Sequence, residues 1–406
     1  MNVLFVSPHF PSHFYHFCAE LKALGANVLG VGDAPYEEIG DRCRAALTEY
    51  YRVGSLEDYD AVHRAAAFFI HKYGRLDFVE GQNEYWLVTE AQLREDFNVA
   101  HGFRPADLAT VKRKSRMKAG YERAGVKTAR YCVVEGPGVK SVAAVRRFAK
   151  KCGFPLVAKP DKGVGAANTY KINGSEELDA FLFNKPDDVP YIVEEFVPGH
   201  VETYDGIVDA GGEVVFAASQ RMWVTPLAML QGDGENVSVT QPLAGTDLEK
   251  TGRATVRGFG LVSEFFHFEF IRLDRDKAGL GRKGEIVGLE VNLRAPGGYI
   301  PDKMNFAHNV DVYRIWAETL VRGTSVSFRD FRFTWYVTHF ARGGAVKYRH
   351  GVDEVRAKYA GGDRWLFDSV PAAVLSGGMG AYAALLRAGS PDEVREQADY
   401  ILEHAE

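Results

Sequence analysis

The sequence predicts a mixed fold, in which an α/β layer at the N-terminus precedes a larger α+β region. Strand-like and helix-like segments alternate along residues 2–97, which is typical of a parallel sheet covered by helices. After Pro105 the composition changes, and strand-like runs are joined by short turns that contain glycine. A chain of 406 residues is long enough for two or three domains with separate cores.

Composition and charge exclude several classes of protein. The net charge is −5, from 49 Lys and Arg against 54 Asp and Glu, whereas nucleic-acid binders are usually basic. No apolar run approaches the roughly 18–20 residues of a membrane helix, and the first residues lack the basic segment of a signal peptide. We therefore expect a cytoplasmic protein without nucleic-acid or membrane partners. Its four cysteines form no CxxC pair and are expected to be reduced thiols.

The first 105 residues are predicted to form the α/β layer, element by element. Val3–Val6 is a continuous apolar run, as expected of a strand buried on both faces. Apolar residues at helical spacing then predict a helix that ends near Gly25. Further elements follow as strand 27–32, helix 61–74, strand 76–81 and a helix from Glu84 to about Phe97. Glu80 and Glu84, like Ser7, Pro8 and His9, lie where the carboxyl edge of such a layer binds ligands.

The middle of the chain opens with a basic helix and a hairpin. Residues 111–125 predict one helix that ends at glycine, and residues 141–153 predict another. The stretch Phe154–Ile172 predicts a hairpin with Lys159 on its first strand, ahead of the glycines at its tip. A P-loop has the opposite order, with the lysine after the last glycine and a helix behind it. The hairpin is therefore not a P-loop.

The remaining elements are mostly strands. Strands are predicted at 191–199, on either side of a turn at 210–212 within 201–219, at 265–274 and at 285–294, and a helix at 311–321. Residues 223–243 show no periodicity and are rich in Gly, Asp and Asn, which predicts a mobile loop. Beyond residue 323, alternating segments at 337–348 and 372–378 precede a last helix from Pro391 to His404.

Polar residues alternate along the two strands at 265–274 and 285–294. Glu290, Asn292 and Arg294 share one face of their strand, and Glu269 lies opposite Glu290 if the connecting loop is symmetric. Two facing carboxylates repel each other unless a positive group lies between them. Two glutamates and an asparagine suit Mg²⁺, and a nearby arginine suits a phosphate or carboxylate. The alternative is an exposed sheet face on which each glutamate pairs with a lysine.

Taken together and in order, these motifs resemble the ATP-grasp superfamily over residues 106–320. The resemblance implies a Rossmann-like pre-ATP-grasp domain at 1–105, a two-lobed ATP-grasp domain at 106–320 and a small C-terminal α+β segment at 321–406. The lobes would be 106–195 and 196–320. The C-terminal segment would pack on this core and either complete the acceptor pocket or make a homodimer contact.

The resemblance also implies roles for individual residues. Lys114 and Lys159 would contact the phosphates of ATP, with Lys159 and Arg294 at the reacting group. Mg²⁺, as one or two ions that Mn²⁺ could replace, would be held by Glu269, Glu290 and Asn292. The remaining nucleotide contacts would come from the hairpin tip, the strand that bonds adenine and a ribose contact, namely Gly163, Gly165, Glu194, Glu195, Phe196, Val197 and Glu202.

The reaction implied by the resemblance is the joining of a carboxylate to an amine or a thiol. ATP would first convert the carboxylate into an acyl phosphate, and an amino-acid or dipeptide ligase is one expected type. A carboxylase that uses bicarbonate and a non-catalytic ATP-binding sensor or scaffold are the alternatives. The two small-molecule substrates are not implied, because the sequence of the 223–243 loop is unfamiliar.

Overall fold

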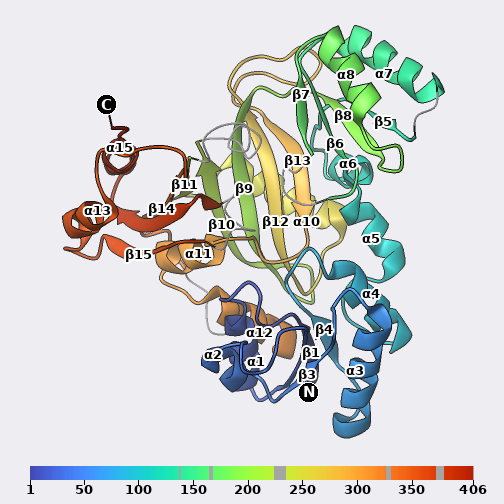
Figure 1. Cartoon of the computed structure of the whole chain (residues 1–406), viewed down its shortest axis with the longest axis vertical. Helices are drawn as coiled ribbons and strands as arrows, with labels where there is room; N and C mark the ends of the chain where they lie inside the picture. The colour runs from blue at the N-terminus through green and yellow to red at the C-terminus, as the bar shows by residue number, and fades with distance from the viewer. Residues whose placement is uncertain (137–138, 164–167, 224–234, 326–330, 372–378, 406) are drawn as a thin grey trace.

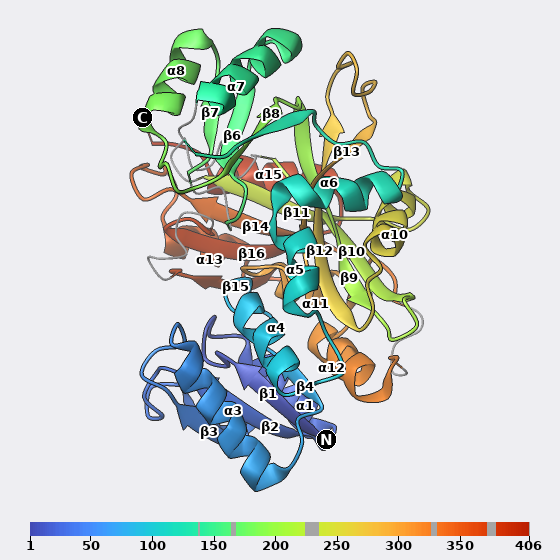
Figure 2. The same ribbon diagram turned by 90° about the vertical axis from the view of Figure 1, so that its right-hand side faces the viewer.

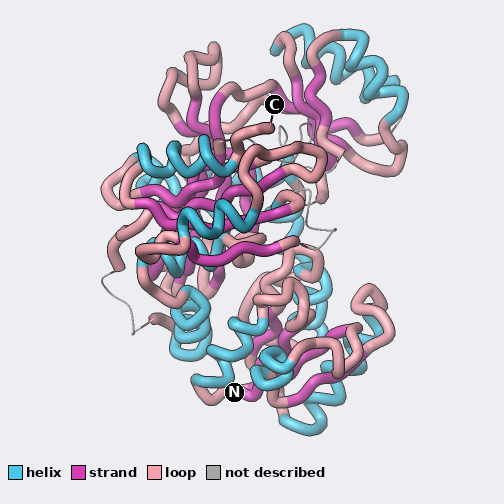
Figure 3. The backbone as a smooth tube through the Cα atoms, turned by 60° about the vertical axis from the view of Figure 1, so that its left-hand side comes forward, coloured by secondary structure: helices cyan, strands magenta, loops and turns pink. Residues whose placement is uncertain are grey.

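The computed structural model describes the whole chain except residues 137–138, 164–167, 224–234, 326–330, 372–378 and 406. In the described part of the chain the strands form three sheets. The N-terminal layer lies at one end of the long axis, the largest sheet lies in the middle, and a small sheet lies at the other end (Figures 1 and 3). None of the described helices is both long enough and apolar enough to cross a bilayer.

The N-terminal layer is a parallel sheet in the order β3-β2-β1-β4. All five residues of β1 are buried, as the continuous apolar run predicts. Figure 2 shows α3 lying along one side of this sheet, with α4 leading away from it towards the middle of the molecule. The elements are β1 (Asn2–Val6), α1 (Tyr15–Ala23), β2 (Asn27–Gly32), α2 (Asp41–Ala46), β3 (Glu49–Arg52), α3 (Tyr59–Tyr73), β4 (Phe78–Glu80) and α4 (Leu87–Asp96).

The small sheet is antiparallel, in the order β5-β8-β6-β7, and α7 and α8 pack on it (Figure 2). The predicted hairpin is its β6–β7 pair, in which Leu156 lies opposite Ile172. The elements from α5 to this sheet are α5 (Pro105–Lys112), α6 (Lys114–Arg123), β5 (Tyr131–Val134), α7 (Val139–Cys152), β6 (Leu156–Pro160), β7 (Tyr170–Ile172), α8 (Ser175–Asn184) and β8 (Tyr191–Glu195).

The large sheet has the order β13-β12-β9-β10-β11-β14-β16-β15, and its pairs are antiparallel. It therefore continues across residue 320, because its last three strands come from the C-terminal segment. Its elements and the helices around it are β9 (Gly199–Val208), β10 (Val214–Met222), β11 (Asn236–Gln241), α10 (Asp247–Phe259), β12 (Glu264–Leu273), β13 (Ile286–Asn292), α11 (Ile300–His308), α12 (Val312–Arg322), β14 (Tyr336–Arg342), α13 (Val352–Tyr359), β15 (Trp365–Ser369), β16 (Tyr382–Ala388) and α15 (Pro391–Ile401).

The N-terminal layer and the large sheet share one apolar core. Phe17 of α1 packs with ring centroids 4.8 Å from Tyr313 and 5.1 Å from Trp316, both on α12. The same phenyl ring meets Phe265 of β12 edge to face at 6.4 Å. Because aromatic side chains bury the largest apolar areas, this cluster holds the layer firmly against the sheet that carries the predicted carboxylates.

Two sequence predictions need correction. The helix predicted over residues 111–125 is two helices, because Arg113 has an extended backbone and Asp161 binds the start of α6. The backbone oxygen of Asp161 accepts from the Lys114 N–H at 2.9 Å, and the Asp161 carboxylate accepts from the Ser115 N–H at 2.8 Å. These contacts replace the hydrogen bonds that a continuous helix would make there.

The loop predicted over residues 223–243 is in part a strand. Residues Asn236–Gln241 form β11, which pairs with β10 on one side and β14 on the other. Its sequence, NVSVTQ, alternates polar residues with Val237 and Val239 as a half-buried strand does, and the interpretation of the whole stretch as an aperiodic loop missed this pattern. Residues 224–234 of the predicted loop, and the predicted segment 372–378, lie outside the described residues.

Candidate active site

A pocket of about 300 Å³ lies between the small sheet and the first strands of the large sheet. Its walls come from the start of α6, from β6, β8 and β9, and from the β12–β13 pair. Many of its side chains are charged, which is unusual for a site that binds only apolar molecules. The predicted site residues that line it are Lys114, Lys159, Glu194, Glu195, Phe196, Val197, Glu269, Glu290, Asn292 and Arg294.

The facing carboxylates are present as predicted. In the β12–β13 pair Glu269 lies opposite Glu290, and His267 lies opposite Asn292. Lys114 Nζ is 3.2 Å from Glu290 Oε1, and His267 Nε2 is 3.3 Å from Glu269 Oε1. Both the metal interpretation and the lysine-paired alternative were open from the sequence. The structure pairs one glutamate with a lysine, and neither carboxylate lies on an exposed face.

The residues present fit a magnesium ion that also binds phosphate. Within the described ranges, no three or more His, Cys, Asp and Glu side chains are grouped so as to hold a metal ion on their own. Two adjacent glutamates and Asn292 across the same strand pair provide oxygen ligands for a partial shell. Mg²⁺ is usually bound in this way, through one or two carboxylates with substrate phosphates and water completing the shell.

Three buried charged side chains, Glu194, Lys118 and Lys159, lie together beside the hairpin and are here called the charged wall. Glu194 of β8 contacts Lys159 Nζ at 2.7 Å and also bonds the ammonium of Lys118 on α6. Burial opposes ionisation of Glu194, but Lys118 and Lys159 outweigh it and lower its pKa to about 2. The group of three therefore carries one net positive charge, and Lys114, the first residue of α6, lines the same pocket. Such a wall is suited to phosphate.

Lys118, which bonds the pocket residue Glu194, was not singled out by the sequence interpretation. It is buried, and it follows Lys114 by four positions on the same face of α6. That i, i+4 spacing was visible in the sequence but was shared with other basic residues of the helix. Only the break at Arg113 shows which face of the helix is turned inward.

A histidine links the carboxylate pair to the interior of the sheet. Asp205 of β9 lies opposite His267 and contacts its Nδ1 at 2.5 Å, while Nε2 faces Glu269. Burial opposes protonation of His267, but Asp205 and Glu269 outweigh it and raise its pKa to about 9. The imidazole is therefore charged at neutral pH and stabilises the ionised form of Glu269.

Arg294 follows the last ligand strand and lines the pocket. Its Nε lies 3.4 Å from Glu84 Oε2, and its Nη1 donates to the Ala295 carbonyl at 2.8 Å. Glu84 comes from the loop after β4, so the N-terminal layer contributes directly to the site. The other glutamate named for that loop, Glu80, is buried beside Arg94 and does not line the pocket.

The comparisons with known proteins were made on sequence and on structure. No family model matches the chain. A curated relative, the L-arginine-specific L-amino acid ligase of Bacillus subtilis, is 24% identical over 255 residues, which are 60% of this chain and 57% of that protein. The L-amino acid ligase of Bacillus licheniformis has a TM-score of 0.72 at 16% identity, covering 98% of this chain and 97% of that one. This chain has the ATP-grasp fold.

A third neighbour carries nucleotide in its structure. The biotin carboxylase domain of the 2-oxoglutarate carboxylase from Hydrogenobacter thermophilus, solved with MgADP, ADP and bicarbonate, has a TM-score of 0.65 at 15% identity, covering 98% of this chain and 89% of that one. The mixed α/β architecture and the ATP-grasp resemblance predicted from the sequence are thus confirmed at the level of the fold.

The strand predicted to bond adenine, β8, and the two residues that follow it line the same pocket as Arg294. Glu195 turns its carboxylate to Arg130, with Nη2 to Oε2 at 2.7 Å, so its side chain is already paired. Phe196 and Val197 line the pocket directly after β8. The expected ribose contact, Glu202, accepts from Arg272 Nε at 2.9 Å and contacts His200 at 3.1 Å. Its role stays a prediction.

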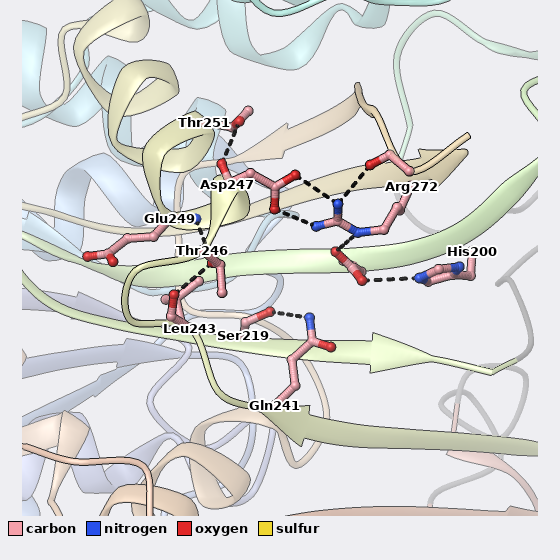
Figure 4. A network of polar contacts seen from close by, with 11 residues as sticks. His200, Ser219, Gln241, Leu243, Thr246, Asp247, Glu249, Thr251 and Arg272 are labelled. Carbon is pink, nitrogen blue, oxygen red and sulfur yellow. Dashed lines mark hydrogen bonds and ion pairs between the residues drawn. The ribbon is translucent and has the colours of Figure 1, made fainter. Parts of the chain in front are cut away.

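Arg272 links β12 to the start of α10. It binds both oxygens of Asp247, and Figure 4 shows its guanidinium between this aspartate and the side of the sheet where His200 lies. Lys114 Nζ donates to the Gly163 carbonyl at 2.9 Å, which ties the start of α6 to the loop after β6. Gly165, the other glycine predicted to touch phosphate, lies outside the described residues.

Proposed function

We propose that the protein is an ATP-dependent ligase that joins a carboxylate to an amine, with amino acids as the substrate class. The observation that carries the proposal is the convergence of Lys114, Lys159, the Glu269–Glu290 pair and Arg294 on one pocket. The fold and the curated relative, an amino-acid ligase, support it. We also propose the domain layout predicted from the sequence, with residues 1–105 as the pre-ATP-grasp domain.

The proposed nucleotide site uses the whole pocket. Phe196, Val197 and the backbone of β8 would hold the adenine, and Glu202 would reach the ribose once released from Arg272. Lys114 and Lys159 would neutralise the phosphates, since a phosphate oxygen can share the ammonium that Glu194 now contacts. Mg²⁺, held by Glu269, Glu290 and Asn292, would supply charge neutralisation at the phosphates when it is bound.

The proposed reaction needs positioning more than a strong base. The terminal phosphoryl group passes from ATP to an oxygen of the substrate carboxylate, leaving ADP and an acyl phosphate. The amine then forms the C–N bond, the C–O bond to phosphate breaks, and phosphate leaves while the nitrogen loses a proton. Arg294 would stabilise the charge on the transferred group, because its planar fork matches phosphate and carboxylate.

The test measures ADP and phosphate release with Mg-ATP against the L-amino acids, supplied singly and in pairs, and against other carboxylic acids with and without amines. Release that requires one carboxylate and one amine together supports the ligase. Release that depends on bicarbonate alone would indicate a carboxylase instead of the proposed ligase. Tight Mg-ATP binding without release in any pool would favour a sensor or scaffold. Sedimentation of the same samples tests for the predicted homodimer.

A further inference from the structure

The loop after β4 reaches across to the segment that carries Arg294. The side-chain oxygen of Gln82 accepts a hydrogen bond from the backbone N–H of Ala295 at 2.8 Å, between residues 213 positions apart. Glu84 lies 3.4 Å from Nε of Arg294. We propose that Gln82 and Glu84, here named the β4 clamp, position the Arg294 guanidinium for reaction. The inference rests on the proposed function, which places Arg294 at the transferred phosphate.

Gln82 is itself held in a conformation that few non-glycine residues adopt. Its φ is +56°, in the left-handed region, and its side chain is buried. Its Nε2 donates to Glu80 Oε2 at 3.2 Å, so both ends of the amide have partners. The preceding Gly81 passes so close to β1 that a Cβ there would lie 3.0 Å from the Val6 carbonyl oxygen. Backbone conformations of this kind persist where the surroundings impose them, often at functional sites.

The two clamp residues act on Arg294 in different ways. Gln82 holds the N–H of Ala295, and Arg294 Nη1 donates to the carbonyl of that same residue at 2.8 Å. The main chain of Ala295 is therefore fixed at its N–H and in turn holds the guanidinium at its carbonyl. Glu84 meets Nε, and its other oxygen lies 3.2 Å from Lys112 Nζ. Contacts within the described part of the chain use Nε and Nη1 of Arg294, which leaves Nη2 for a ligand.

A clamp of this kind matters because arginine recognises phosphate through a fork of fixed shape. A shift of about 1 Å in a reacting or binding group can cost roughly 100-fold in rate. Without Gln82 the Ala295 N–H would lose its acceptor, and the peptide would be free to tilt. The loss should affect phosphate binding and spare the residues proposed to hold adenine, Phe196 and Val197, which directly follow β8.

The experiment measures binding of inorganic phosphate to the full chain in the presence of saturating MgADP, together with MgADP affinity and the melting temperature. The variants are Gln82→Met, Arg294→Ala and the double variant. Gln397→Met is the matched control, since Gln397 of α15 is also buried and donates to a backbone carbonyl at 2.9 Å. We expect Gln82→Met to weaken phosphate binding about 10-fold, which is the effect of losing one hydrogen bond between the Arg294 guanidinium and phosphate. The affinity for MgADP should not change.

The double variant separates positioning from a purely structural role. If Gln82 acts through Arg294, adding Gln82→Met to Arg294→Ala causes no further loss of phosphate affinity. Equal losses of phosphate and MgADP affinity, or independent losses that add, would overturn the clamp. So would phosphate binding that equals the parent's in Gln82→Met, or a parent protein that does not bind phosphate with MgADP at all.

Glu84→Gln provides a second variant if Gln82→Met does not fold. It preserves the shape of the side chain and removes the charge beside Nε, and the same selective loss of phosphate affinity is expected. Phosphate binding needs no carboxylate or amine substrate. If no substrate pool stimulates ADP release but the variants lose phosphate affinity as expected, the ligase is refuted and the clamp is not. If a carboxylate and an amine do stimulate release but the variants keep their phosphate affinity, only the clamp is refuted.

Discussion

Replacement of Glu194 by glutamine provides the most direct test of the charged wall. Glu194 lies between Lys118 and Lys159, and all three side chains are buried. The glutamine has nearly the same shape but carries no charge, so two ammonium groups would face each other without a counterion. Buried charges that lose their partner are strongly destabilising, because neither water nor an opposite charge then solvates them.

The magnitude follows from two independent estimates. The pKa of Glu194 is lowered from 4.5 to about 2, which corresponds to about 3 kcal/mol in favour of the charged form in the folded state. Removing one partner of a buried ion pair costs about 3–5 kcal/mol in other proteins. We therefore expect Glu194→Gln to lower the free energy of unfolding by about 3 kcal/mol near pH 7. Since the folded pKa is depressed, this stabilisation is present above pH 4.5 and is lost as the pH falls towards 2.

The assay is urea denaturation of the parent and the variant at pH 7 and at steps down to pH 3, where the difference between them should shrink. Glu285→Gln is the control, since Glu285 also pairs with a lysine at 3.1 Å but lies in solvent, and its removal should leave stability unchanged. Adding Lys118→Met to Glu194→Gln should restore part of the loss. A Glu194→Gln variant as stable as the Glu285→Gln control would refute the account of the charged wall.

Three further predictions concern the carboxylate strands. Glu290→Gln should weaken Mg²⁺-dependent nucleotide binding at least roughly 10–100-fold while metal-free binding stays unchanged, as titration calorimetry with and without EDTA would show. Gly288→Ala would place a Cβ 2.6 Å from the ring of Tyr121 and should cost about 1–3 kcal/mol in denaturant unfolding. The pKa of His267 is raised to about 9 beside Asp205. The stabilisation from this pair is therefore complete below pH 6.5 and is lost as the pH rises through 9. In His267→Gln the free energy of unfolding should no longer fall over that pH range.

Much of the site could be predicted from local patterns. Side chains alternate on a strand, so the sequence predicts that Glu290, Asn292 and Arg294 share a face, and the symmetry of the β12–β13 connection predicts that Glu269 lies opposite Glu290. Lys159 lies on the first strand of the predicted hairpin, ahead of its glycine-containing tip, and the structure has it on β6. These predictions succeed because they depend on backbone geometry and on residues a few positions apart.

Two other features were missed, one because it has no local signal and one in spite of its signal. Asp161 divides the helix predicted over residues 111–125 at the residue before Lys114, which lines the pocket, and this partner is distant in the sequence. Asn236–Gln241 alternates polar residues with Val237 and Val239, which is a local strand pattern, and β10 and β14 pair with it on both sides.

The sequence by itself determined the residue types of the proposed ligand set and the two strands that carry it, because hydrophobic period and residue type act locally. Only the tertiary structure decided which charges neutralise one another. Glu194 meets Lys118, Asp205 meets His267, and Gln82 meets the peptide after Arg294. Each of these contacts joins separate elements, and burial, which is a property of the assembled fold, sets the strength of the charged ones.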